Sequence, residues 1–189
     1  MVKETYVFID GAYLSLISKH FGKGKYLNFD IHEFATGMAK SEGLWLKGTF
    51  YYTAPPFQGS HPSKDEIQRK SRYDRFVSNL RKIQNFVIRE GRCQRVDGEY
   101  HQKGVDTLFT MDLFDVSRDR SIETFLLVTC DTDFVPILNK LRELGIKIVL
   151  FYFSDFERKS RFSMSNHILT ACDKKVLLTP EHFKNSMKK

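Results

Sequence analysis

Short, wholly apolar runs alternate along this chain with longer segments in which apolar residues recur every three or four positions. The runs at 6–9, 125–128 and 146–153 have the length of strands, and their unbroken apolar character is typical of strands buried on both faces. The segments between them have the period of amphipathic helices. Strands that alternate with helices in this way predict an α/β layer fold with a mainly parallel central sheet.

One unit of this kind is especially clear. The strand Phe125–Val128 stops at Thr129, and a helical pattern runs from Phe134 to Leu144. Gly145 ends that helix, and a second apolar run follows at 146–153. A strand, a crossover helix and a second strand form the unit from which parallel sheets are built.

The other elements are expected from the same patterns. Further strands are predicted at 44–53, 86–95 and 174–178, and Asp97-Gly98 predicts a hairpin turn that returns through 99–101. Further helices are predicted at 13–21, 31–41, 64–84, from Asp106, at 164–171 and from Pro180. The segments 54–62 and 154–161 are predicted loops.

Two of these helices lead to more detailed expectations. The helix at 64–84 has an apolar stripe and, mostly elsewhere, an almost wholly positive face. The stripe consists of Ile67, Tyr73, Phe76, Val77, Leu80 and Ile83. The helix that follows Asp106 is apolar nearly all round, which predicts close packing on the sheet. Its apolar residues are Leu108, Phe109, Met111, Leu113 and Phe114.

Composition indicates one globular domain. The 189 residues contain no internal repeat or linker, so we expect a single domain over 1–189, with a core at about 5–178 and a C-terminal helix and tail at 180–189. The three cysteines are far apart in the sequence, which argues against a disulfide framework and for a reducing compartment. No apolar run reaches the length of a membrane span, so we expect a cytoplasmic protein without a membrane partner.

The charge balance favours an anionic partner. Thirty Lys and Arg residues against 23 Asp and Glu residues give a formal net charge of +7. Such an excess favours nucleic acid over a membrane surface as the partner. On the helix at 64–84, Arg69, Arg72 and Arg75 are candidate phosphate contacts, although a charged helix face is more often only solvated.

Acidic residues stand where several of these elements meet. Asp10 follows one buried strand, Asp131 follows another, and Asp106 begins a helix entered from a third. The carboxyl ends of parallel strands share one edge of a sheet, so these side chains can converge there. Converging carboxylates need a compensating cation, and oxygen ligands suit Mg²⁺ or Mn²⁺. Acids that bind a metal, in a basic protein, suit phosphodiester hydrolysis.

Three motifs resemble those of the NYN domain, a PIN-like, LabA-type nuclease family. They are Phe8-Ile9-Asp10-Gly11, then Lys103-Gly104-Val105-Asp106 with Asp112 after it, and Val128-Thr129-Cys130-Asp131-Thr132-Asp133-Phe134. The resemblance covers the chain from Tyr6 to about Leu178 and implies a PIN-like (Rossmann-like) three-layer α/β/α fold. It also implies metal-dependent cleavage of RNA, with Asp10, Asp106, Asp131 and Asp133 as the catalytic and metal-binding acids.

The sequence departs from the family pattern at two places. Tyr13 stands where members usually have Asn, and Thr129-Cys130 stands where they often have Ser-Gly. The carboxylates are kept, but a polar group that supports them is lost or replaced. Among the acids, Asp112 is interpreted as structural, because its spacing from Asp106 does not share a helix face well.

Each acid also has an alternative structural role. Asp10 could be a turn residue before Gly11, and Asp106 could simply favour its helix N-terminus. Asp131 could be a loop acid, and Asp133 is a plausible helix cap.

Three further residues are candidates for contacts with nucleic acid. Lys103 could bind a phosphate or neutralise the acids, Thr129 could orient a carboxylate, and Tyr13 lies beside the first motif. An exposed lysine and a simple strand-end threonine are the alternatives.

Two other functions compete with a ribonuclease. A haloacid-dehalogenase-type phosphotransferase is suggested by Asp131-x-Asp133 after a strand, but it would leave Asp10 unused. A non-catalytic RNA-binding module with the same fold is suggested by Tyr13.

Overall fold

A six-stranded parallel sheet forms the centre of the protein. The computed structural model describes residues 2–154 and 165–188. The strands lie in the order β3-β2-β1-β6-β7-β8, and each neighbouring pair is parallel. Their bounds are β1 (Glu4–Asp10), β2 (Trp45–Thr53), β3 (Phe86–Glu90), β6 (Thr124–Val128), β7 (Lys147–Tyr152) and β8 (Lys174–Leu177).

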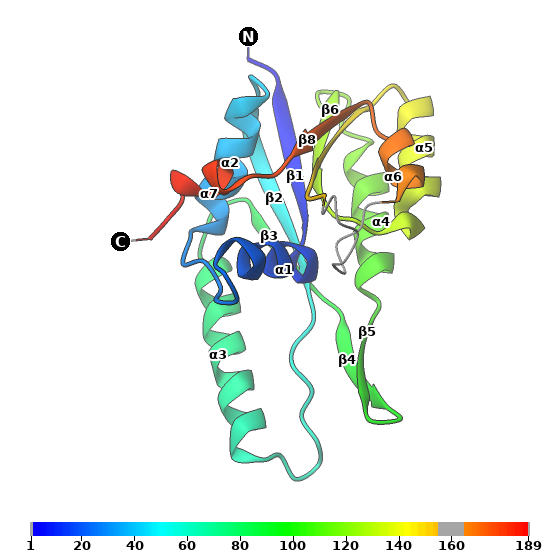
Figure 1. Cartoon of the computed structure of the whole chain (residues 1–189). Coiled ribbons are helices and arrows are strands. Elements are labelled where there is room, and N and C mark those ends of the chain that lie inside the picture. Colours follow the sequence, from blue (N-terminus) through cyan, green and yellow to red (C-terminus); the bar gives the residue numbers. More distant parts are fainter. Residues whose placement is uncertain (1, 155–164, 189) are drawn as a thin grey trace.

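Helices cover both faces of the sheet, so the expected three-layer α/β/α fold is confirmed (Figure 1). One face carries α1 (Gly11–Phe21), α2 (Ile31–Ser41), α3 (Lys64–Leu80) and α7 (Pro180–Lys184). The other face carries α4 (Val105–Val116), α5 (Val135–Glu143) and α6 (Asn166–Thr170).

Alternate residues of the strands supply the two halves of the core. In β1, Val7 and Ile9 pack under α1 and α2, while Phe8 packs under α4. In a strand, successive side chains point to opposite faces, so an unbroken apolar run fills both halves at once. This is why the short runs in the sequence marked the central strands correctly.

The strand order reverses between β1 and β6, and the region beyond the carboxyl ends of these two strands is called the β1–β6 crevice. From β1 the chain moves outward through β2 to β3, and it then returns to the other side of β1 as β6. Ile9 of β1 is paired with Val128 of β6, so both strands end at the same level. In open parallel sheets, ligands bind beyond the carboxyl ends of the strands at such a reversal of strand order.

The predicted strand at 86–95 is wrong, because the chain breaks at Gly91. Residues before the break form β3, and those after it form β4 (Arg92–Val96), which pairs only with β5 (Glu99–Lys103) in a separate hairpin. A Cβ atom on Gly91 would lie 2.6 Å from the Lys103 carbonyl oxygen. The returning strand therefore crosses close to a residue without a side chain, which apolar periodicity cannot reveal.

The predictions for α3 and α4 were wrong in part. α3 ends at Leu80 rather than near 84, and its first half extends beyond the sheet (Figure 1). Ile67, in that first half, is exposed, and Phe76 is exposed too, while Val77 and Leu80 are the buried residues of the stripe. In α4, Met111 and Phe114 are also exposed, because only one side of this helix meets the sheet.

Other elements lie close to their predicted positions. A 3-10 helix, η1 (Thr132–Phe134), precedes α5 where one continuous helix from Phe134 was expected. Most of the predicted loop at 154–161 and the start of the predicted helix at 164–171 lie outside the described residues. Within the described ranges, no helix is long and apolar enough to cross a membrane.

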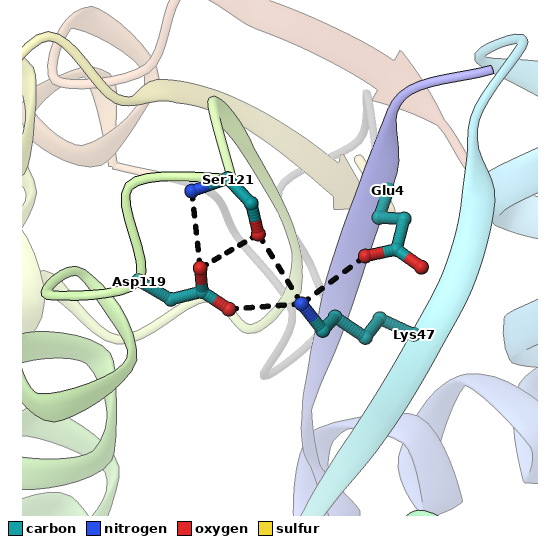
Figure 2. A network of polar contacts seen from close by, with 4 residues as sticks. All are labelled: Glu4, Lys47, Asp119 and Ser121. Carbon is teal, nitrogen blue, oxygen red and sulfur yellow. Dashed lines mark hydrogen bonds and ion pairs between the residues drawn. The ribbon is translucent and has the colours of Figure 1, made fainter. Parts of the chain in front are cut away.

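At the amino edge of the sheet, Lys47 ties three segments together (Figure 2). Its ammonium group lies 2.9 Å from Asp119 and 3.1 Å from Glu4, and it donates a hydrogen bond to Ser121. The hydrogen bonds and charges of these two acids raise the pKa of Lys47, and the bonds from Ser121 and Lys47 lower the pKa of Asp119 to about 2. The loop before β6 is thereby attached to β1 and β2.

Asp112 joins α4 to the sheet through an ion pair. Arg89 donates from Nε and Nη2 to the two oxygens of this buried carboxylate, at 2.8 and 2.7 Å. The hydroxyl of Tyr52 donates to Oδ2 at 3.0 Å. These contacts agree with the structural interpretation of Asp112.

Replacing Asp112 by Ala should therefore lower the free energy of unfolding by about 2–3 kcal/mol, because Tyr52 and the partly exposed Arg89 lose a charged acceptor. Denaturant titration measures the change. Asp115→Ala, an exposed acid on the same helix, should alter stability by less than about 0.5 kcal/mol. Equal effects of the two substitutions would contradict the assigned role.

Candidate functional site

Asp10 is both the last residue of β1 and the N-cap of α1. Its Oδ1 accepts hydrogen bonds from the backbone N–H groups of Ala12 and Tyr13, at 2.9 and 3.1 Å. The capping bonds fix the orientation of the carboxylate at the β1–β6 crevice. Because both bonds fall on Oδ1, the second oxygen stays available to a ligand.

Asp131 plays the same part after β6. Its Oδ1 accepts a hydrogen bond from the N–H of Asp133 at 2.9 Å, so Asp131 caps η1. The capping role expected for Asp133 was therefore wrong: Asp133 lies inside the first turn and is exposed. The backbone N–H of Asp131 donates to the buried Thr129 hydroxyl at 3.2 Å, so Thr129 contacts the backbone of Asp131 and not its carboxylate.

Asp106 approaches the same edge from a third direction. It lies in the first turn of α4, after Gly104 in the left-handed conformation (φ 81°). Asp106 and Asp133 line one open pocket of about 310 Å³, together with Thr107 and Phe134. The hairpin between β3 and α4 thus brings this acid back to the end of β6.

The acids act on one another electrostatically. Burial raises the pKa of Asp10 to about 6, the neighbouring charges of Asp106 and Asp131 add to the effect, and the two capping N–H groups oppose it. Burial, followed by the charges of Asp131 and Asp133, also raises the pKa of Asp106. Three segments far apart in the sequence therefore share one negative field without an equal positive charge.

The chemistry of these groups fits a hard divalent cation. Carboxylate oxygens are the ligands that Mg²⁺ and Mn²⁺ favour, and a cation would offset both the burial and the neighbouring charges that raise the pKa of Asp10. Across residues 2–154 and 165–188, no three His, Cys, Asp or Glu side chains are close enough together to enclose an ion. Mg²⁺ commonly binds through only one or two carboxylates and keeps several waters, so the loose grouping still suits it.

Tyr13 and Cys130 support the site from within the core. The Tyr13 side chain is 2% exposed, and its hydroxyl accepts a hydrogen bond from the N–H of Phe153 at 2.8 Å. A contact between this side chain and RNA, considered from the sequence, is incompatible with that burial. Burial and the charges of Asp10 and Asp131 raise the pKa of the Cys130 thiol to about 12, which agrees with a packing role.

The basic candidates lie around the site rather than within it. Lys103 is exposed at the end of β5, three residues before Asp106. Arg69, Arg72 and Arg75 are exposed on α3, and Arg72 lines a second pocket beside α1. Tyr51, which the sequence did not indicate, lies directly against Gly11. No local pattern could have revealed it, because β2 meets α1 only in the folded chain.

The sequence matches the NYN domain over residues 4–178, nearly its whole length. The chain belongs to the NYN domain family. NYN domains are generally nucleases and typically use divalent metals, so membership indicates a function related to nucleic acid, RNA in particular. This family assignment confirms the resemblance seen in the three motifs.

One solved structure supports the fold of this NYN domain. A protein of unknown function, VPA0982 from Vibrio parahaemolyticus, superposes with a TM-score of 0.60 at 17% identity, covering 98% of this chain and 97% of that one. A pyrazinamidase/nicotinamidase from Streptococcus mutans has a TM-score of 0.38 at 13% identity, covering 89% and 93%, and supports no conclusion here. No curated protein matches the sequence at a significant level.

Gly11→Ala should destabilise the NYN domain by about 1–3 kcal/mol. A Cβ atom there would lie 2.6 Å from the Tyr51 ring and 2.7 Å from the Tyr52 carbonyl oxygen, so the start of α1 must shift away from β2. Denaturant titration measures the loss. The matched control is Gly37→Ala in α2, where a Cβ meets nothing within 4 Å, and it should stabilise by about 0.5–1 kcal/mol. If both substitutions changed the free energy of unfolding in the same direction, the close contact of Gly11 with Tyr51 and Tyr52 would be refuted.

Asp10→Asn should make the metal-free protein more stable at neutral pH, by about 1–3 kcal/mol. The folded-state pKa of about 6 lies above the ordinary 3.8, so the folded protein binds more protons than the unfolded chain between these pH values. Stability of the wild type therefore falls as pH rises through this window. Asn removes that loss and still caps the helix.

Thermal melting from pH 3 to 8 in EDTA tests this expectation, with Asp115→Asn as the control. Below the ordinary pKa of 3.8, wild type and Asp10→Asn should have the same stability. Adding Mn²⁺ at neutral pH should raise the melting temperature of the wild type more than that of Asp10→Asn. If the stability difference between wild type and Asp10→Asn were the same at every pH from 3 to 8, the raised pKa of Asp10 would be contradicted.

Proposed function

We propose that this protein is a Mg²⁺- or Mn²⁺-dependent ribonuclease that hydrolyses phosphodiester bonds at the crevice between β1 and β6. The observation that carries the proposal is the placement of Asp10, Asp106 and Asp131, which come from three separate segments and lie near enough for their charges to add to the burial that raises the pKa of Asp10. A fold gains nothing in stability from such like charges, so a ligand that needs them is the simplest explanation.

Asp10 and Asp131 are the acids best suited to hold the cation. Each has one oxygen fixed by a backbone N–H group and one left for a ligand, so the carboxylates are oriented before a ligand arrives. Asp106 and Asp133 are more exposed and line the adjoining pocket, where they would complete the site through direct or water-mediated contacts. A bound divalent cation supplies Lewis acidity and makes water a better nucleophile at neutral pH.

The surrounding basic residues would attract the substrate. The net charge of +7 draws a polyanion toward the protein, while the acids alone would repel it. Lys103 and the arginines of α3 lie outside the acid cluster, on elements that extend from the carboxyl edge of the sheet (Figure 1). They can therefore contact phosphates without neutralising the metal ligands.

One observation favours a second candidate, a non-catalytic RNA-binding module. Among the described residues, three acids do not come close enough to enclose an ion, and Tyr13 occupies the usual asparagine position with its side chain buried. Without the asparagine side chain, the acids have fewer hydrogen-bonding groups around them to orient their carboxylates. The family assignment lends nothing to the phosphotransferase alternative.

Asp131→Asn should reduce metal-dependent cleavage of RNA by at least about 100-fold. Loss of a residue that only orients a metal ligand typically costs about 10- to 100-fold in activity, and loss of the ligand itself should cost more. The protein should cut labelled single-stranded or structured RNA with Mn²⁺ or Mg²⁺, and EDTA should abolish the activity. Gel analysis of time courses gives the rates.

Asp115→Asn, which changes an exposed acid of α4, serves as the matched control and should cleave at the wild-type rate. Equal activity of Asp131→Asn and wild type would remove Asp131 from the mechanism. RNA binding without any metal-dependent cleavage by the wild type would select the binding module.

A further inference from the structure

A second pocket lies beside the acid site, between α1, α3 and the segment that leads into α2. Its volume is about 530 Å³, within the range of about 300–1,000 Å³ found for small-molecule sites. Its wall is unusually rich in aromatic side chains, and it includes two cationic ones. The aromatic residues are Tyr26, Phe29, Tyr51, Tyr73 and Phe76, and the cations are Arg72 and Lys188.

The pocket and the acid site share part of their structure. Tyr51 lines the pocket, and a Cβ placed on Gly11 would lie 2.6 Å from its hydroxyl oxygen. Leu14 and Ser15, also in the pocket wall, follow the Asp10 cap by about one turn of α1, or roughly 6 Å of helix rise. A polymer that crosses the crevice therefore passes within reach of the pocket.

Two aromatic rings in the pocket remain accessible. Phe76 is 38% exposed and makes an edge contact with Tyr51, with ring centroids 5.9 Å apart. Tyr26 is 68% exposed. Burial of such rings normally stabilises the fold, so rings left exposed around one concavity indicate a flat, apolar ligand. Nucleobases have that character, and they stack on aromatic side chains.

The charge of the pocket indicates an anionic ligand. Arg72 is exposed, and no carboxylate of residues 2–154 or 165–188 forms an ion pair with it. Lys188 forms an ion pair with Asp30 at 3.7 Å, and its side chain is 54% exposed. By helical spacing, Arg69 lies on the same face of α3 as Arg72 and Phe76. Cations next to stacking rings suit a base with its phosphate.

We propose that this pocket binds a nucleobase of single-stranded RNA whose backbone crosses the aspartate site, with Arg72 contacting a neighbouring phosphate. The inference rests on the proposed function, since it specifies the form of the substrate. A paired base inside a duplex cannot enter such a pocket, whereas an unpaired base can turn outward and stack. The protein should thus prefer unpaired segments.

Phe76→Ala should weaken the binding of a labelled, unstructured RNA of roughly twelve nucleotides by about 5- to 150-fold, the range typical of one lost stacking partner. Fluorescence anisotropy in EDTA gives the dissociation constants without cleavage. The control is Phe114→Ala, which removes an equally exposed ring (40%) from α4 and should bind as the wild type does. Tyr26→Ala, at an exposed position, should also weaken binding and guards against misfolding of the first variant.

Abasic nucleotides identify the group that is bound. Removing the base at one position of the RNA should weaken binding to the wild type but add little to the loss already caused by Phe76→Ala. A duplex of the same sequence should bind more weakly than the single strand. The proposal would be overturned if Phe76→Ala and Tyr26→Ala both bound RNA as tightly as the wild type. It would also be overturned if the abasic nucleotide weakened binding to the wild type and to Phe76→Ala by the same factor.

The test of the pocket and the test of the proposed nuclease can fail independently of each other. Binding data in EDTA that agree with the pocket, with no cleavage in Mn²⁺, would support the pocket and reject the enzyme. Cleavage by the wild type, with Phe76→Ala and Tyr26→Ala unaffected in binding and rate, would support the enzyme and reject the pocket.

Discussion

Carboxylates that are partly buried and face like charges beyond the ends of β1 and β6 are the main electrostatic constraint in this structure. Burial, and after it the charges of Asp106 and Asp131, raise the pKa of Asp10 to about 6, and burial and neighbouring charges also raise the pKa of Asp106. Nothing in the packing of the core requires acids there, because either helix could start with a neutral cap. The sheet, by ending β1 and β6 at the same level, brings these charges together.

The opposite edge of the same sheet shows how the chain treats acids that serve the fold. There Glu4 and Asp119 are brought together by Lys47, and the pKa of Asp119 falls to about 2 (Figure 2). Asp112 is likewise matched by Arg89. At the carboxyl edge, no Lys or Arg of the described residues forms an ion pair with Asp10 or Asp131. One protein thus neutralises its structural acids and leaves the acids of the crevice uncompensated, a difference that points to an external cation.

Sequence reasoning succeeded where the deciding signal is local. A buried strand is visible as an apolar run, and an acid at or within three residues of its end is visible in the same stretch of sequence, so β1, β6 and the positions of Asp10 and Asp131 at their ends were predicted. It failed where distant segments meet. The break at Gly91 depends on the returning hairpin, the exposed half of α3 depends on where the sheet stops, and the pocket at Tyr51 depends on the approach of β2 to α1. The burial of Tyr13 depends in the same way on Phe153.

Helix capping and ligand binding, which were treated as alternatives for the acids, turn out to be compatible. A cap uses one carboxylate oxygen, and in Asp10 both capping bonds fall on the same one. The helix start then holds the second oxygen in a fixed direction, as a supporting hydrogen bond does for a metal ligand. A parallel sheet with helices that begin directly after its strands therefore produces oriented carboxylates as a consequence of its connectivity. In this protein two neighbouring strands, β1 and β6, are each followed by such a cap, at Asp10 and at Asp131.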